Sequence, residues 1–246
     1  MPFRNVAAID AARELQNGAC TLCNGAMTKM LILKETDLVA RGMQREIYLH
    51  PTDPGKLVKV LRAHPETAAR SGFGNFMEKH FPMTRARHIR KEYTEYLRLM
   101  LSNQDPAFRP PITHMYGFAP TQLGLGCVTE RVTTKQGGLA KTLHALVQNG
   151  GVTPRNLDLL NDTINRLYQC NIRASDLTAK NLVFGRRDGG PKECVLVDGF
   201  GDIHAIPVRS MAGWSNRLGL DDSCKRLGQR TGLSWNNKTR EFSQPA

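Results

Sequence analysis

Two polar segments, each bordering a short apolar run, constrain this 246-residue chain more than any other feature. In the first, Asp176 is followed five residues later by Asn181 and then by the apolar run 182–184. In the second, the apolar run 194–197 ends at Asp198. Short apolar runs bounded by turn residues are typical of buried strands. The pattern therefore predicts that Asn181 directly precedes one strand, with Asp176 in the loop before it, and that Asp198 lies at the end of another strand.

The spacing within the first segment has a chemical explanation. An Asp that meets an attacking hydroxyl and an Asn that reaches a magnesium ion from the same short loop form the pattern of a kinase catalytic loop. Asp198, at the end of a buried strand, is where a second magnesium ligand belongs. Each segment alone is weak evidence for such a site. In the simpler alternative, Asp176 and Asn181 are turn residues and Asp198 caps the end of a strand. In this order along one chain they support each other.

A lysine inside an apolar strand supplies the third feature. Lys59 lies within the run 55–61, and burial of an unpaired ammonium group is strongly disfavoured unless it meets an anion. The alternative is an edge strand with Lys59 facing water. The amphipathic helix predicted over 87–101 offers Glu92 at the margin of its apolar face, with Glu95 farther toward solvent. Glu92 would then form an ion pair with Lys59. The alternative is that Glu92 is a solvent-exposed acid on the helix surface.

The segment 40–48 has the spacing of a phosphate-binding glycine loop but keeps only the middle glycine, Gly42. Ala40 and Arg45 stand where the other two glycines would be, so the backbone can approach phosphate less freely. Arg41 or Arg45 could supply charge in place of the lost backbone N–H groups.

The pattern of apolar and turn residues in the rest of the sequence indicates mostly strands in the first half and mostly helices in the second, with a hairpin late in the chain. A helix begins at Pro154 with Thr153 as its N-cap, and another helical region begins near Leu139. The polar stretch 63–81 reads as an insertion or loop. Strands are expected within 31–48, 55–61, 112–118, 126–132, 182–184 and 194–197.

Together these motifs resemble a protein-kinase-like fold, and more specifically the YrbL family of PhoP regulatory network proteins. The resemblance is carried by 42–48 with the following His50-Pro51, by Lys59, 89–92, 177–181, and Asp198 with Phe200-Gly201. It implies an α+β fold with two lobes: a β-rich N-lobe over 30–132 and a shortened helical C-lobe over 133–246. Residues 1–29 would be an N-terminal extension or reflect a start codon placed too far upstream.

The resemblance also implies a role for each residue. Lys59 and Glu92 would form the pair that positions the phosphates, near Gly42. Asp176 would be the catalytic base, with Lys180 meeting the γ-phosphate. The implied magnesium ligands are Asn181 and Asp198, and the implied adenine-binding hinge runs from Glu130 to Val132 and acts through its backbone.

Departures from the pattern leave two functions open. The residues before Asp176 are Ala174 and Ser175, so the usual His-Arg is absent, and 48 residues after Asp198 are too few for a full peptide-docking region. We expect ATP and Mg²⁺ as cofactors and γ-phosphate transfer to an unidentified hydroxyl acceptor, a small molecule or a protein. The alternative is a pseudokinase-like regulatory module that binds nucleotide without transferring phosphate.

Composition limits the partners. The chain carries 34 Lys+Arg against 22 Asp+Glu, a net charge of +12, which implies an anionic partner. A basic nucleic-acid-binding protein is the second alternative, but aromatics are only 7% and no stacking motif is found. No apolar stretch is long enough to span a membrane. Without an apolar leader, and with its cysteines single apart from the Cys20/Cys23 pair, the chain is expected in the cytoplasm.

Overall fold

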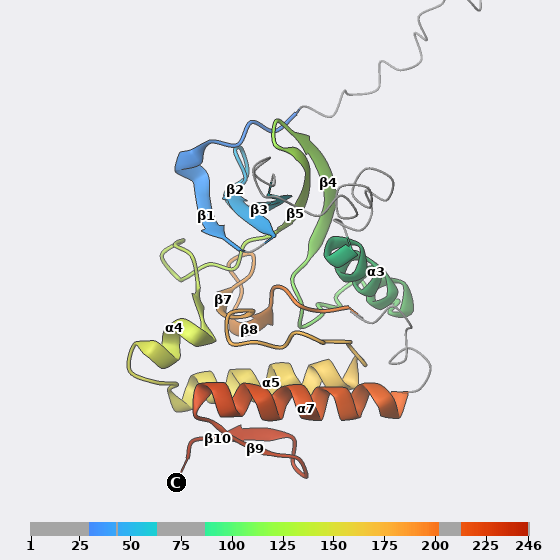
Figure 1. Ribbon diagram of the computed structural model, residues 1–246, viewed down its shortest axis with the longest axis vertical. Helices are drawn as coiled ribbons and strands as arrows, with labels where there is room; N and C mark the ends of the chain where they lie inside the picture. The colour runs from blue at the N-terminus through green and yellow to red at the C-terminus, as the bar shows by residue number, and fades with distance from the viewer. Residues whose placement is uncertain (1–29, 43, 63–86, 202–212, 246) are drawn as a thin grey trace, which may run out of the picture.

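The computed structural model describes residues 30–42, 44–62, 87–201 and 213–245. The expectations for 1–29, including Cys20 and Cys23, and for the loop 63–81 lie outside these residues. Figure 1 shows a twisted sheet beside one helix in the upper half, and helices with short hairpins in the lower half. We call these halves the sheet lobe and the helical lobe. The α+β class predicted from the sequence is confirmed.

The sheet lobe is built on five antiparallel strands in the order β1-β2-β3-β5-β4. Their bounds are β1 Leu38–Arg41, β2 Arg45–Leu49, β3 Lys56–Leu61, β4 Met115–Thr121 and β5 Gly124–Glu130, preceded by the short 3-10 helix η2 Glu35–Asp37. Because β3 pairs with β2 on one side and β5 on the other, Lys59 is not on an edge. Its side chain is 4% exposed, which excludes the water-facing alternative.

Helix α3 (Arg87–Ser102) confirms the predicted helix, but its buried face differs from the expected one. Glu92 and Glu95 are both buried, whereas Leu97 is 40% exposed. The expectation that Glu95 faces solvent was therefore wrong, as was the solvated alternative for Glu92. Hydrophobic periodicity misjudges this face because the two acids are buried in ion pairs, which apolar patterning does not register.

The helical lobe contains α4 (Leu143–Gln148), α5 (Pro154–Gln169) and α7 (Gly213–Thr231). Thr153 caps α5 as predicted, since its hydroxyl accepts a hydrogen bond from the Asn156 N–H and Pro154 begins the helix. Figure 1 shows α5 and α7 side by side, and the Tyr168 hydroxyl donates to Asp221 across them at 2.5 Å. The short strands are β6 Lys141–Thr142, β7 Leu182–Arg186, β8 Lys192–Leu196, β9 Ser234–Asn236 and β10 Glu241–Ser243.

The main hydrophobic core joins the two lobes. It unites Ile89 and Leu99 of α3 with Leu160 and Leu167 of α5. A smaller cluster lies in the sheet, and a third, formed by Val132, Val183 and Val195, lies where the lobes meet. Packing shared in this way positions the sheet, α3 and the β7–β8 hairpin around one central region. None of the helices in the described part of the chain has the length and apolarity needed to cross a bilayer.

Candidate functional site

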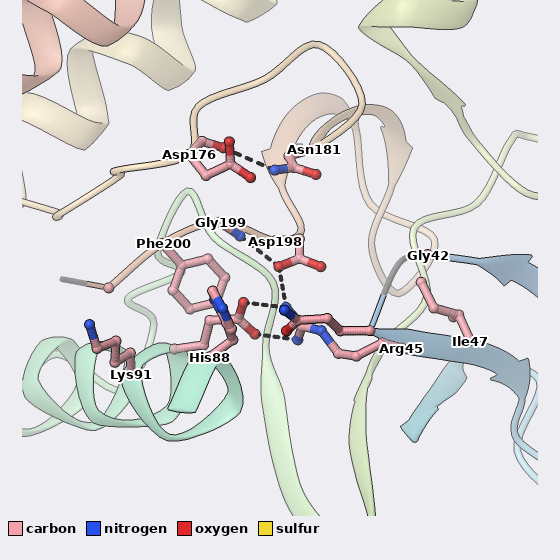
Figure 2. Close-up of a pocket in the computed structure, with 13 residues that line it drawn as sticks. Gly42, Arg45, Ile47, His88, Lys91, Asp176, Asn181, Asp198, Gly199 and Phe200 are labelled. Carbon is pink, nitrogen blue, oxygen red and sulfur yellow. Dashed lines mark hydrogen bonds and ion pairs between the residues drawn. The ribbon is translucent and has the colours of Figure 1, made fainter. Parts of the chain in front are cut away.

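A polar cavity of about 260 Å³ lies between the lobes (Figure 2). It receives side chains from β2, from α3, from the loop that precedes β7 and from the segment that follows β8. Its charged and amide-bearing lining residues include Arg45, Glu92, Asp176, Asn181 and Asp198. The two segments singled out in the sequence therefore meet at one place, as expected.

An apolar cavity of about 240 Å³ adjoins the polar one. The two share Ile47, Asn181 and Asp198 as lining residues, so they form a continuous region. Its walls are largely aliphatic and come from both lobes: Val39, Ala40, Leu57, Val132, Leu139, Val183 and Val197. Lys59 and Lys180 also line it. The result is a largely apolar space that adjoins a charged one.

Arg45 holds two of the three acids that line the polar cavity. Its guanidinium donates to both oxygens of Glu92, at 2.8 and 2.7 Å, and to Asp198 at 2.6 Å (Figure 2). Lys59 instead donates to the carbonyl oxygen of Val197 at 2.7 Å. The expected Lys59–Glu92 ion pair is thus not the one formed. The planar fork of an arginine matches a carboxylate in a way that a lysine cannot, which favours Arg45 as the partner of Glu92.

The acids of this network have displaced pKa values. Burial alone would raise the pKa of Asp198, but Lys59, a hydrogen bond from Glu92 and Arg45 together hold it well below its usual range. Burial and the neighbouring Asp198 together raise the pKa of Glu92 to about 7, against the opposing effect of Arg45. Asp198 therefore carries the negative charge, and Glu92 is the group poised to hold a proton.

The loop 176–181 and the segment that contains Asp198 are held together through Gly199. The Asp176 N–H donates to the Gly199 carbonyl at 3.1 Å, and the Asn181 side-chain amide donates to the Asp176 carbonyl at 2.9 Å. Gly199 has a φ of +79°, and a Cβ there would lie 2.4 Å from the Asp176 carbonyl oxygen. Only glycine permits this approach, which sets the distance between Asp176 and Asp198.

The other residues expected at the site are distributed around it. Asp176 and Lys180 are exposed, at the polar and the apolar cavity respectively. Gly42 lines the polar cavity, but its N–H donates to the Arg45 carbonyl at 2.8 Å within the β1–β2 turn. The Gly42 amide thus already has a hydrogen-bond partner within the chain, which argues against its use as a phosphate-binding N–H group.

Glu130 and Val132, the two ends of the expected hinge, line the apolar cavity, and part of their polar surface already has hydrogen-bond partners. The Glu130 carboxylate pairs with Arg187 at 3.2 Å and accepts the His114 N–H at 2.7 Å. The Val132 carbonyl accepts the Ala140 N–H at 3.2 Å. Adenine binding by this backbone stays a prediction.

Two functional candidates were missed in the sequence. Thr113 and Thr129 are each 1% exposed and line the apolar cavity, and neither hydroxyl has a hydrogen-bond partner among the described residues. A buried hydroxyl without a partner is costly, so these two groups point to a polar ligand edge in the cavity. Threonine is common in strands, and nothing in its sequence context distinguishes an unpartnered hydroxyl from a partnered one.

The donor set fits a hard cation. Asp198 offers a carboxylate, and Asn181 offers its side-chain oxygen because its amide nitrogen is used by the Asp176 carbonyl. Mg²⁺ is typically held by one or two such protein oxygens, with phosphates and water as its other ligands. In the described part of the chain no group of three or more His, Cys, Asp or Glu side chains could form an all-protein metal centre.

Fold and site together define a class. An antiparallel sheet with one helix beside it, a crossing into a helical lobe after β5, and an Asp–Asn loop facing an Asp at a strand end make this a protein-kinase-like fold. The chain belongs to the family of PhoP regulatory network protein YrbL, whose model matches residues 31–231. No curated protein sequence matches it.

Similar solved structures include the PknI kinase domain of Mycobacterium tuberculosis. The unmodified domain has 16% identity and a TM-score of 0.42, over 82% of this chain and 75% of that one. A variant of the same domain has 17% identity and a TM-score of 0.41, over 77% and 71%. The likeness is distant, and the kinase-like arrangement of this chain stands on its own strands, helices and family membership.

Proposed function

We propose that this protein binds a nucleoside triphosphate together with Mg²⁺ and transfers the γ-phosphoryl group to a hydroxyl acceptor. The observation that carries the proposal is the pair of adjoining cavities, one apolar and one charged, that share Asn181 and Asp198. An apolar slot suits a base, and a charged space suits phosphates. The unpartnered hydroxyls of Thr113 and Thr129 support a ligand with a polar edge.

In this proposal each side chain has one task. Asp198 and Asn181 would hold Mg²⁺, which neutralises charge on the phosphates. Lys59 would contact the phosphates from the sheet. Asp176 would accept the proton of the acceptor hydroxyl as its oxygen bonds to the γ-phosphorus and the bond to the β-phosphate oxygen breaks, while Lys180 stabilises the transferred group.

Replacement of the proposed base tests this reading. Asp176→Ala should lower acceptor-dependent ATP turnover by about 10²- to 10⁴-fold and leave nucleotide affinity nearly unchanged, because the base acts only in the transition state. The matched control is Asp222→Ala, which removes an aspartate of α7 whose side chain is 61% exposed and which lines neither cavity of the candidate site. Equal turnover in Asp176→Ala and the wild-type protein would sink the assignment.

A pseudokinase-like regulator is the second candidate. The Arg45–Asp198 ion pair favours it, because Arg45 and Mg²⁺ would compete for the same carboxylate. The lone glycine of the β1–β2 turn favours it as well. Mg²⁺-dependent nucleotide binding, with no ATP consumed across sugars, amino acids and peptides as acceptors, would select this function over phosphotransfer.

A further inference from the structure

A third cavity, of about 360 Å³, lies in the helical lobe and is lined by five cationic side chains. We call it the basic cavity; its cations are Lys135, Lys141, Arg155, Arg186 and Lys192. No acidic residue lines it, and it shares no lining residue with either cavity of the candidate site. It is thus a separate feature that nucleotide binding does not explain.

Strand pairing places three of these cations on one face of a small sheet. The strands run in the order β6-β7-β8, and Arg186 of β7 lies directly opposite Lys192 of β8. Lys141 of β6 pairs with Phe184, which is two residues from Arg186 and therefore on the same face. Like charges directly opposite each other destabilise a sheet, so the pairing of Arg186 with Lys192 is unfavourable unless an anion joins them.

The fourth cation is placed equally poorly for stability. Arg155 is the second residue of α5, where the N-terminal end of the helix carries partial positive charge, and the first turn holds no acidic residue. A cation at this end of a helix is unfavourable, and an anion is favourable. The helix therefore adds to the positive potential of the basic cavity.

The hydrogen bonds of the cavity orient its cations without neutralising them. Arg186 donates to the Gly190 carbonyl at 2.7 Å, and Lys192 donates to the Asn156 side-chain oxygen at 2.6 Å. Both acceptors are uncharged, and Asn156 itself is 4% exposed. Within the described ranges no ion pair is formed by Lys135, Lys141, Arg155, Arg186 or Lys192.

We propose that the basic cavity binds a small polyanion with two or more phosphoryl groups. Lysine and arginine are the side chains that bind phosphate most strongly, and several of them around one cavity match several phosphoryl groups. Such an anion would offset both the repulsion between Arg186 and Lys192 and the unfavourable interaction of Arg155 with the positive end of α5. The site is independent of the nucleotide site, so either proposal can fail without the other.

Calorimetric titration with inorganic tripolyphosphate tests the site. The double variant Lys141→Gln/Arg155→Gln should weaken the tightest binding event by at least about tenfold, as the loss of two charge-assisted contacts predicts. The matched control is Lys225→Gln/Arg230→Gln, which removes two exposed cations of α7 and should bind as the wild-type protein does. The nucleotide site contributes equally in all three proteins.

The thermal stability of the unliganded proteins provides a second readout. Lys141 and Arg155 are both exposed, and Arg155 is a cation at the positive end of α5. The Lys141→Gln/Arg155→Gln variant should therefore be at least as stable as the wild type, so its lost affinity cannot come from misfolding. Three results would overturn the proposal: no tripolyphosphate binding by the wild type, equal weakening in the α7 control, or tighter binding of an oligoglutamate peptide than of tripolyphosphate.

Discussion

A single guanidinium group governs the charges of the polar cavity. Arg45 bonds to Glu92 and to Asp198 at once, so two of the three acids that line the cavity depend on one side chain from β2. Because a bound Mg²⁺ would compete with Arg45 for the Asp198 carboxylate, we expect Arg45 to release Asp198 when the metal and nucleotide bind. The charge state of Glu92 determines how firmly Arg45 is then held.

That charge state makes a prediction about pH. Burial raises the pKa of Glu92 from its ordinary 4.5 to about 7, so between these values the folded protein holds a proton that the unfolded chain has released. The stabilisation from this group is complete below about pH 4.5 and is lost as the pH rises to about 7. Glu92→Gln cannot titrate. Between pH 5 and 8 the wild type should therefore lose about 2 kcal/mol of stability relative to Glu92→Gln, measured by urea unfolding.

Comparison with one variant isolates this effect. His50, His88 and His114 have pKa values lowered chiefly by burial, and they work in the opposite direction, but they are present in both proteins and cancel. A stability difference that stays constant from pH 5 to 8 would show that Glu92 does not titrate in this range.

At the residue scale the sequence predicted neither burial nor pairing fully. An isolated lysine in an apolar strand left Lys59 either buried against an anion or facing water from an edge strand, and Glu95 was wrongly expected to face solvent. The partner of Glu92 was not predictable, since Arg45 and Lys59 are both cations. Which of the two pairs with Glu92 depends on where strands β2 and β3 place each side chain relative to α3, and a local sequence pattern does not contain this information.

Helix α3 is connected to the loop that carries Asp176 through a second buried acid. Glu95, 1% exposed, accepts the Arg173 N–H at 3.0 Å and pairs with the Arg173 guanidinium at 3.3 Å. It also pairs with Arg98 at 2.7 Å. Because Arg173 lies three residues before Asp176, the position of α3 and that of the proposed base are coupled.

Substitutions in the ion-pair network around Glu95 should lower the free energy of unfolding by unequal amounts. Glu95→Gln should lower the free energy of unfolding by about 3 kcal/mol, because Arg173 and Arg98 lose their shared buried counter-charge. Arg98→Gln should cost less, since its side chain is 30% exposed and Glu95 keeps Arg173. Chemical denaturation of both variants measures this. Equal costs would contradict a central role for Glu95.

The glycine between the two site segments gives a prediction with a matched control. Gly199 and Gly232 have similar φ values, +79° and +75°, but a Cβ would meet Asp176 only at Gly199. Gly232→Ala should cost about 1 kcal/mol from backbone strain alone. Gly199→Ala should cost more and should also weaken Mg²⁺-dependent nucleotide binding, which Gly232→Ala leaves intact. Similar effects on stability and binding would show that the close approach is not required.

Elements with strong local signals were predictable and those without were not. The Thr153 cap, the proline after it and an apolar stripe marked α5, and turn residues marked the β7–β8 hairpin. Helix α7 went unpredicted because its apolar residues are few and interrupted by Gly219 and Gly228. Strands β9 and β10 are three residues each, too short for an alternating pattern.

For the whole molecule, the two-lobed plan was expected from the resemblance to the kinase-like family. The residues that carry this resemblance come from both halves of the chain: Lys59 and Glu92 belong to the sheet lobe, and Asp176 and Asn181 belong to the helical lobe. The adjoining cavities were not predictable, since their walls combine side chains that no sequence window contains together. The basic cavity was not predictable either, because the net charge of +12 does not indicate where in the fold the cations gather.

The central claim is that the cleft between the lobes binds nucleotide with Mg²⁺, and thermal unfolding tests it most directly. ATP at about 100 times its dissociation constant should stabilise the wild type by about 2.7 kcal/mol with Mg²⁺ present and by less without it. Lys59→Ala should lose most of the nucleotide effect, Asp198→Ala should lose the Mg²⁺-dependent part, and the exposed Lys225→Ala should behave as the wild type. A wild-type protein whose unfolding temperature does not respond to ATP and Mg²⁺ would contradict the account.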